Sequence, residues 1–113
     1  EVMFVDEAQD LSPLQWQLVS VLAQNSNRVY IAGDDDQAIF RWAGADVDHL
    51  VSISKGNARV LDQSYRIPSS VHEIADKVIR RVKFRTDKSW KPRQEKGQVI
   101  SEASFEHVDL ITF

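Results

Sequence analysis

The chain has 113 residues, a net charge of −3 and no cysteine, and 42% of its residues are hydrophobic. This length suits one domain or parts of two, and the composition is ordinary for a globular protein. The lack of cysteine excludes a disulfide framework and, with only three histidines, a zinc site of the usual spacing. We find no membrane span and no leader segment, so we expect a protein of the reducing cytoplasm.

Residues 2–5 are four consecutive apolar residues, which predict a parallel strand buried on both faces. Asp6, Glu7 and Asp10 follow it, and open α/β sheets bind ligands beyond the carboxyl ends of their strands. Asp6 could hold Mg²⁺ directly or through water, while Glu7 orients and deprotonates an attacking water. The alternative is a polar turn in which Asp10 or Ser12 caps the next helix.

A helix and a second strand are expected next. Ser12 and Pro13 predict a helix that ends near Asn25. Residues 28–32 predict an apolar strand, so residues 1–33 form one strand-helix-strand unit of a parallel sheet with a right-handed crossover. The apolar stripe of the helix consists of Leu14, Leu18, Val21 and Leu22.

A second polar cluster, residues 33–45, follows this strand. Gly33 permits a tight turn, Asp34 and Asp36 add acids at the edge of the sheet, and Gln37 offers an amide to a phosphate oxygen or a water. Phe40 and Trp42 flank Arg41 and could stack on nucleic-acid bases, although Trp42 could equally be a core aromatic.

The elements predicted after residue 45 are three helices, two strands and a loop. A helix starts at Asp46, with Val47, Leu50 and Val51 on one face, and stops before Gly56. A strand covers residues 58–61, a charged loop residues 84–97, another strand residues 98–103, and a last helix begins near Ser104 and Glu106. Between them, Ser70 and Glu73 predict a capping box for a helix whose core stripe is Val71, Ile74, Ala75, Val78, Ile79 and Val82.

Charge is unevenly distributed along the chain. Residues 1–50 carry nine acids and two bases, whereas residues 51–113 carry eight acids and twelve bases. Nine of these bases lie between Lys77 and Lys96, which favours contact with a polyanion. A solvated helix face and loop explain the same pattern equally well.

A third cluster contains Tyr65 and Arg66. Arginine suits the charge of a transferring phosphoryl group and tyrosine can stack on a purine, although alone the pair is more often a surface tyrosine and a salt-bridging arginine.

In this order, the three clusters resemble the second, third and fourth motifs of the UvrD, Rep and PcrA group of superfamily 1 DNA helicases. Those motifs read roughly D-E-A-Q-D, G-D-x-x-Q-S-I-Y-x-x-R-G-A and N-Y-R. Here they stand at residues 6–10, 33–45 and 64–66. The similarity extends from residue 1 to about residue 75, and residues 88–90 look like the lysine-and-tryptophan region of the family.

The resemblance implies an α/β fold of the RecA-like, P-loop NTPase kind. Residues 1–55 would belong to the first RecA-like domain and residues 56–113 to the second. It also implies ATP, Mg²⁺ and single-stranded and duplex DNA as ligands and substrates, and a role in DNA repair or replication. Asp6 would then coordinate Mg²⁺, Glu7 would be the catalytic base, and Gln37 would sense the γ-phosphate.

The same resemblance gives roles to the aromatic and arginine residues. Trp42 would stack on single-stranded DNA, Tyr65 would pack against the adenine, and Arg66 would be the arginine finger.

The chain departs from the family pattern at three positions. The serine after the glutamine is Ala38, the tyrosine is Phe40, and the arginine before glycine is Ala43. Phe40 keeps the ring for stacking. Ala43 removes a cation expected near the nucleic acid, and our hypothesis is that Arg41 partly substitutes for it.

Two other functions compete with a DNA helicase. A superfamily 2 RNA helicase has a similar acidic motif, but the cluster from Gly33 to Gln37 argues against it. A non-catalytic, helicase-like binding module is disfavoured by Glu7, Gln37 and Arg66. The sequence contains no phosphate loop of the form G-x-x-x-x-G-K-[ST], so we expect a fragment of a larger helicase that does not hydrolyse ATP alone.

Overall fold

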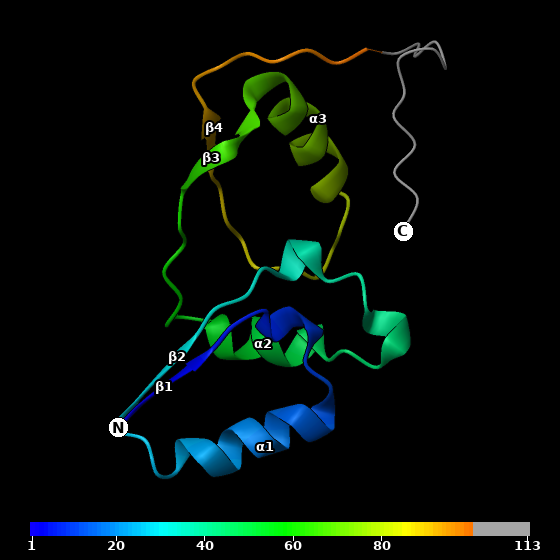
Figure 1. Cartoon of the computed structure of the whole chain (residues 1–113). Coiled ribbons are helices and arrows are strands. Elements are labelled where there is room, and N and C mark those ends of the chain that lie inside the picture. Colours follow the sequence, from blue (N-terminus) through cyan, green and yellow to red (C-terminus); the bar gives the residue numbers. More distant parts are fainter. Residues whose placement is uncertain (101–113) are drawn as a thin grey trace, which may run out of the picture. The chain divides into compact units, whose positions relative to one another are not determined.

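The computed structural model describes residues 1–100, which fall into two compact units. The first unit contains residues 1–60 and 82–88, and the second contains residues 61–81 and 89–100. Both are small α/β arrangements, each with a two-stranded parallel sheet (Figure 1). In the described residues, no helix is long and apolar enough to cross a membrane.

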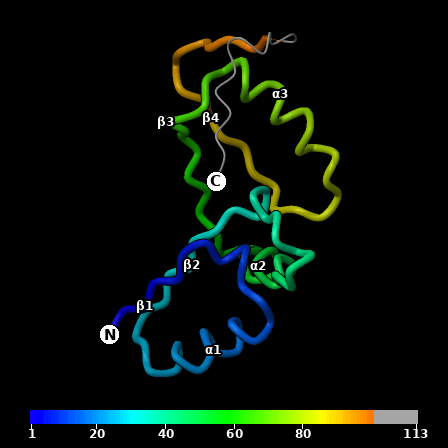
Figure 2. The backbone as a smooth tube through the Cα atoms, turned by 45° about the vertical axis from the view of Figure 1, so that its right-hand side comes forward, coloured from blue at the N-terminus to red at the C-terminus, as the bar shows by residue number. Residues whose placement is uncertain are grey.

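The sheet of the first unit pairs β1 (Val2–Val5) with β2 (Arg28–Ile31). The strands are parallel, with Val2 opposite Arg28 and Val5 opposite Ile31, and they run side by side in both views (Figures 1 and 2). Helix α1 (Pro13–Ala23) lies between them in the chain. This confirms the predicted strand-helix-strand unit, while the handedness of its crossover stays a prediction.

Ser12 starts α1, as predicted. Its hydroxyl accepts a hydrogen bond from the backbone N–H of Gln15 at 3.4 Å, and the side chain of Gln15 accepts one from the backbone N–H of Ser12 at 2.8 Å. This reciprocal pair satisfies two backbone donors at the helix start, and Pro13 occupies a position where its missing N–H costs nothing. The helix ends at Ala23, two residues before the predicted end.

The face of α1 that packs inward differs from the predicted stripe. Leu14 is 75% exposed and Leu18 is 57% exposed, whereas Trp16 is only 4% exposed. Trp16 packs with Ala8 and Leu50, and its ring lies 4.4 Å from that of His49. A large aromatic ring between the leucines therefore decides which face of the helix is buried, because it removes the most apolar surface from water.

Helix α2 (Val47–Ser54) supplies the other side of this core. The carboxylate of Asp46 caps it by accepting the backbone N–H of His49 at 3.1 Å. Val47, Leu50 and Val51, which were predicted to share one face, are buried. Gly56 has φ +80°, a left-handed conformation that glycine adopts without steric cost.

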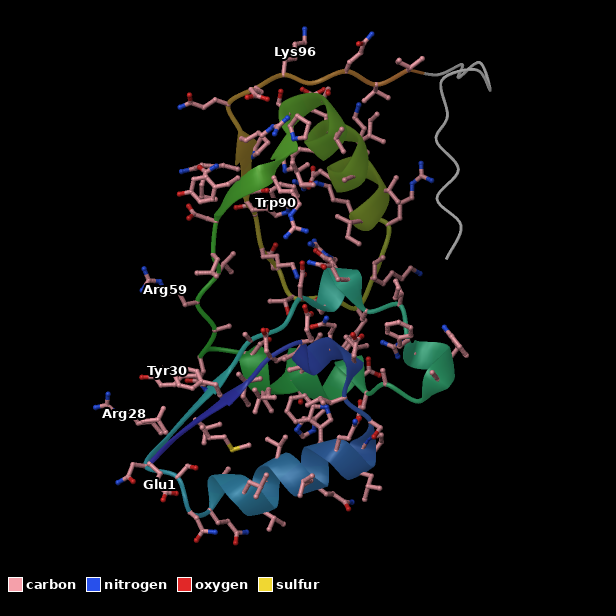
Figure 3. All side chains as sticks on the ribbon, in the orientation of Figure 1. Glu1, Arg28, Tyr30, Arg59, Trp90 and Lys96 are labelled. Carbon is pink, nitrogen blue, oxygen red and sulfur yellow. The ribbon has the colours of Figure 1, made fainter. Side chains whose placement is uncertain are left out.

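The prediction that β1 is buried on both faces is wrong for the described residues. Val2 is 53% exposed and Phe4 is 76% exposed. On this open face Phe4 stacks on Tyr30 of β2, with ring centroids 5.1 Å apart, and Figure 3 shows Tyr30 projecting from the strand. The core of the first unit lies only on the opposite face of its sheet, beside Val5.

The second unit pairs β3 (Gln63–Pro68) with β4 (Lys91–Arg93) in parallel. The predicted strand at residues 58–61 is wrong, because those residues pair with no other strand and Leu61 is 87% exposed. The predicted loop at residues 84–97 is also wrong in part, because it contains β4. At the start of β4, the backbone N–H of Lys91 donates to the carbonyl of Asp62 at 2.6 Å. Ladder hydrogen bonds, which the local sequence does not reveal, decide both cases.

Helix α3 (Ser69–Ile79) forms without the predicted capping box. The backbone N–H groups of Ser69 and Ser70 instead donate to the carbonyls of Glu95 and Lys96, at 3.2 and 2.9 Å. These bonds satisfy the donors that a capping side chain would satisfy. Figure 3 shows Trp90 beneath the helix, where its ring meets His72 edge to face at 4.2 Å.

The core stripe predicted for α3 is wrong in the described structure. None of its residues is buried, Val78 is 58% exposed, and the helix stops before Val82. Residues 98–100 are not a strand, and the remainder of that predicted strand and the predicted last helix lie outside the described residues.

Trp16 is the largest side chain of the described core, so Trp16→Ala should lower the free energy of unfolding by about 3–5 kcal/mol. Trp16→Phe should cost less, because the buried indole N–H has no hydrogen-bond partner to lose. Urea unfolding followed by circular dichroism measures both. Leu14→Ala on the exposed face of α1 is the control, with an expected change within about 0.5 kcal/mol; equal losses for Trp16→Ala and Leu14→Ala would contradict this core.

Candidate functional site

Asp6 and Glu7 leave the carboxyl end of β1 through a strained turn. Glu7 has φ +51° and ψ +38°, and it is the only non-glycine residue of the described chain with positive φ. Its backbone N–H donates to Oδ1 of Asp6 at 2.9 Å. A left-handed residue other than glycine costs roughly 1–2 kcal/mol, so the surrounding contacts must hold this conformation. Both side chains remain exposed.

Gln9 is the buried residue that connects Glu7 to the second acidic loop. Its side chain is 2% exposed. Nε2 donates to Oε2 of Glu7 at 2.6 Å, and Oε1 accepts the backbone N–H of Asp34 at 3.1 Å. The backbone N–H of Ala8 adds a bond to the carbonyl of Ala32 at 3.0 Å. The amide therefore holds the two loops that follow β1 and β2 together.

Gln9 is a site residue that was not predicted from the sequence. Its only signal was an uncharged polar side chain among the three acids that follow a strand. An amide can donate and accept at the same time, which is the property needed to join a carboxylate to a backbone N–H.

Gly33 provides the space for this connection. A Cβ atom there would lie 2.9 Å from Cδ2 of Leu50 and 3.0 Å from Oε1 of Gln9. Gly33 is not among the glycines with positive φ. Its role is thus close packing, whereas the sequence suggested a tight turn.

Asp34 and Gln37 continue the network beyond β2. Nε2 of Gln37 donates to Oδ2 of Asp34 at 2.6 Å, and Oδ1 of Asp34 accepts the backbone N–H of Asp36 at 3.1 Å. Gln37 itself is exposed at the end of a 3₁₀ turn, Asp35–Gln37. The structure therefore brings Glu7 and Gln37 into one chain of hydrogen bonds that runs through Gln9 and Asp34.

Two cations from residues 82–88 neutralise the three consecutive carboxylates. Nζ of Lys88 lies 2.5 Å from Oδ1 of Asp34, 2.5 Å from Oδ1 of Asp35 and 3.4 Å from Oδ2 of Asp36. Arg85 binds Asp36 with two nitrogens, at 2.7 and 2.6 Å. The side chains of Lys88 and Arg85 are only 13% and 16% exposed, so these ion pairs are largely desolvated.

The pKa values of Asp34, Lys88 and Arg85 are shifted toward the charged forms of these groups. Burial opposes the charge of Asp34, yet hydrogen bonds from Lys88 and Gln37 hold the pKa of its carboxyl below the ordinary value. Burial also opposes the charge of Lys88, but its bonds to Asp34 and Asp35 raise its pKa. The hydrogen bonds to Asp36 raise the pKa of Arg85. Asp34, Lys88 and Arg85 are therefore charged at neutral pH.

The basic residues from Lys77 to Lys96 are in large part paired within the chain. Among the described residues, five of the nine form ion pairs with carboxylates. Besides Arg85 and Lys88, these are Arg80 with Asp76, Lys91 with Asp62, and Arg93 with Glu95. This internal pairing accounts for much of the basic pattern that favoured a polyanion.

Of the acids after β1 and β2, Asp6 keeps a carboxylate oxygen open to Mg²⁺, whereas the three acids after β2 do not. The described residues contain no group of three or more acidic, histidine or cysteine side chains arranged around a common metal position. All oxygens of Asp34, Asp35 and Asp36 already accept hydrogen bonds, from Lys88 and Arg85, from the amide of Gln37 and from the backbone N–H of Thr86. Asp6 is exposed and uses one oxygen for a backbone N–H, which leaves the other for an ion that also takes water and phosphate oxygens.

The aromatic residues of the second cluster face solvent. Trp42 is 84% exposed and Phe40 is 42% exposed, so the alternative of Trp42 as a core residue is wrong for the described chain. Arg41 pairs with Asp48, with its nitrogens at 2.7 and 3.3 Å from the two carboxylate oxygens. These hydrogen bonds raise the pKa of Arg41 and lower that of Asp48.

Tyr65 and Arg66 belong to the second unit. Tyr65 is 85% exposed and lines an open hollow of about 450 Å³ together with Gln63 and residues 93–95. The hydroxyl of Ser64 accepts the backbone N–H groups of Arg66 and Ile67 at 3.3 and 3.2 Å. Ser64 therefore shapes the backbone that presents the arginine.

Gln9→Leu should lower the free energy of unfolding by about 1–3 kcal/mol, because it leaves the backbone N–H of Asp34 without a side-chain acceptor. Urea unfolding measures the change. Gln24→Leu is the matched control, since Gln24 is exposed at the end of α1. Equal stability of the Gln9 and Gln24 variants would show that the amide does not hold the loops together.

The lowered pKa of Asp34 predicts a loss of stability in acid. Because the folded pKa lies below the ordinary value of 3.8, the contribution is present above about pH 4 and disappears as the pH falls through the folded value. Asp34→Asn should therefore flatten the dependence of unfolding free energy on pH below about pH 4. Urea unfolding between about pH 2 and pH 6 tests this, with Asp62→Asn at an exposed carboxylate as control. A curve for Asp34→Asn that parallels the unmodified protein would refute the assignment.

Comparison with known proteins gives one consistent family. Residues 1–57 match the model of the UvrD/REP helicase N-terminal domain. The chain is 35% identical over 105 residues to the ATP-dependent DNA helicase PcrA of Bacillus subtilis. The aligned region covers 89% of this chain and 14% of that protein. The chain is 34% identical over 113 residues to PcrA of Leuconostoc citreum, covering 95% and 15%.

A probable DNA helicase II homolog of Mycoplasma capricolum is 32% identical over 104 residues, covering 88% of the chain and 14% of that protein. The chain thus spans about 14% of the length of such relatives. The family match covers half of the chain and includes the acidic loops after β1 and β2. The chain belongs to the UvrD/REP helicase family.

Proposed function

We propose that this chain forms the acidic part of the ATP site in a UvrD-like DNA helicase. The helicase couples hydrolysis of Mg²⁺-bound ATP to movement on single-stranded DNA and to duplex unwinding. Family membership and relatives named as ATP-dependent DNA helicases support this. The observation that carries it is the hydrogen-bond chain joining Glu7 to Gln37, because a base and a phosphate sensor must act on the same nucleotide.

Glu7 and Gln37 suit the two roles that phosphoryl transfer requires. Catalysis of this reaction depends mostly on positioning and on charge. The carboxylate of Glu7, oriented by Gln9, accepts the proton of the attacking water. Gln37 gives one N–H to Asp34, which leaves its carbonyl oxygen and second N–H for the water and a γ-phosphate oxygen. Asp6 binds Mg²⁺, which when present offsets the negative charge of the phosphates.

The second unit supplies Tyr65 and Arg66 in this proposal. The exposed ring of Tyr65 packs against the adenine, and Arg66 acts as the arginine finger. We assign residues 1–55 to the first RecA-like domain and residues 56–113 to the second.

Single-stranded DNA is the partner of the exposed aromatic residues. Base stacking on one aromatic ring contributes roughly 1–3 kcal/mol, and Trp42 presents most of its surface for it, with Phe40 as a second ring. Arg41 can replace the cation missing at Ala43 only by leaving Asp48, so it is a weaker substitute than the sequence suggested.

A non-catalytic binding module remains the second candidate function. These 113 residues contain no phosphate loop, and one is needed to cradle the β- and γ-phosphates. Hydrolysis therefore requires the complete helicase, and the chain alone is the negative control in any ATPase assay.

Glu7→Gln in the complete helicase should retain ATP binding and lower DNA-stimulated hydrolysis roughly 10²–10⁴-fold, the usual contribution of a general base. Steady-state ATPase and equilibrium binding of a fluorescent ATP analogue measure the two effects. Glu73→Gln, at an exposed position of α3, is the matched control. Hydrolysis by the Glu7 variant at the unmodified rate would remove Glu7 as the base and favour the binding module.

A further inference from the structure

Lys88 is connected to Gln37, the proposed phosphate sensor, through a single residue, Asp34. Its Nζ contacts Oδ1 of Asp34 at 2.5 Å, and the other oxygen of the same carboxylate accepts Nε2 of Gln37 at 2.6 Å. Lys88 is separated from Asp34 by 54 positions in the sequence, yet both lie in the first unit. The contact therefore depends on tertiary structure and has no signal in the local sequence.

The two oxygens of Asp34 have different partners, which fixes the orientation of its carboxylate. Oδ1 receives the ammonium of Lys88 and the backbone N–H of Asp36, whereas Oδ2 receives Gln37. The two oxygens of an ionised carboxylate are equivalent, so these partners fix the plane of the group. A charge-assisted bond to one oxygen therefore keeps the other directed at Gln37.

The repulsion among neighbouring acids makes this lysine necessary. Asp34, Asp35 and Asp36 are consecutive, and Asp35 and Asp36 have side chains only 6% and 14% exposed. Arg85 binds only Asp36 through its side chain, so Lys88 is the sole cation of the described residues in contact with Asp34. Loss of its charge would leave Asp34 beside two other carboxylates, which favours movement of Asp34 toward solvent.

We propose that Lys88 is a positioning residue for ATP hydrolysis, which holds Gln37 through Asp34 in the orientation that meets the γ-phosphate. The inference rests on the proposed function of Gln37. Lys88 itself does not touch the nucleotide in this proposal. Its effect should therefore appear in kcat and not in the affinity for ATP.

The kinetic test uses Lys88→Met in the complete helicase, because methionine keeps much of the apolar stem and removes the charge. DNA-stimulated kcat should fall about tenfold or more, as expected when a reacting group is misplaced, with the KM for ATP changed less than about twofold. Lys88→Arg should restore part of the loss. Arg59→Met, which removes an exposed cation without an ion pair in the described residues, should retain the unmodified kcat (Figure 3). An unchanged kcat in Lys88→Met overturns the proposal.

A double variant separates positioning from general structural damage. In a Gln37→Ala background, Lys88→Met should lower kcat no further, because the group that it positions is already absent. A further loss of similar size would show that Lys88 acts on the structure at large and would overturn the proposal. If Lys88→Met does not fold, Lys88→Gln provides the same comparison.

Crystal structures of the variants test the geometry without reference to activity. In Lys88→Met the separation of Nε2 of Gln37 from Oδ2 of Asp34 should exceed about 3.5 Å, the limit of a hydrogen bond, and in Arg59→Met it should not. A complete helicase that hydrolyses no ATP would refute the proposed function alone. An unchanged separation in Lys88→Met would refute the role of Lys88, whatever the activity.

Discussion

The described site depends on the two hydrogen bonds made by the buried side-chain amide of Gln9. Two loops leave the carboxyl ends of β1 and β2, and each carries acids that would repel those of the other. Gln9 joins them without adding charge, because its N–H group binds Glu7 and its oxygen binds the backbone of Asp34. The absence of a side chain at Gly33 makes room for that oxygen. Replacement of either residue would affect both loops together.

Charge compensation is the second constraint on this site. Three consecutive carboxylates follow β2, and desolvated acids are stable in the ionised form only with nearby cations or donors. Lys88 and Arg85 supply those cations from a distant part of the sequence, while Glu7 and Asp6 stay exposed and free of ion pairs in the described residues. The site therefore separates acids with a structural role from acids available to a ligand.

The sequence predicted local features well and long-range features poorly. The helix starts at Ser12 and Asp46 were predicted because they depend on residues within one turn, and the parallel pairing of β1 and β2 followed from their apolar runs. The inward face of α1, the position of β3 and the start of α3 depend on tertiary contacts, so periodicity alone misassigned them. At the site, the motif residues were recognisable, but the roles of Gln9 and Lys88 required coordinates.

The discontinuity of the first unit has a consequence for its folding during synthesis. Residues 82–88 belong to this unit, although residues 61–81, which precede them in the chain, belong to the other. A nascent chain that ends before residue 85 therefore contains the three carboxylates of the 34–36 loop without either cation. β1, α1, β2 and α2 can assemble early through the Trp16 core, whereas the loop that carries Gln37 acquires its fixed form only after α3 has been made. The proposed ATP site is thus among the last parts of this unit to be completed.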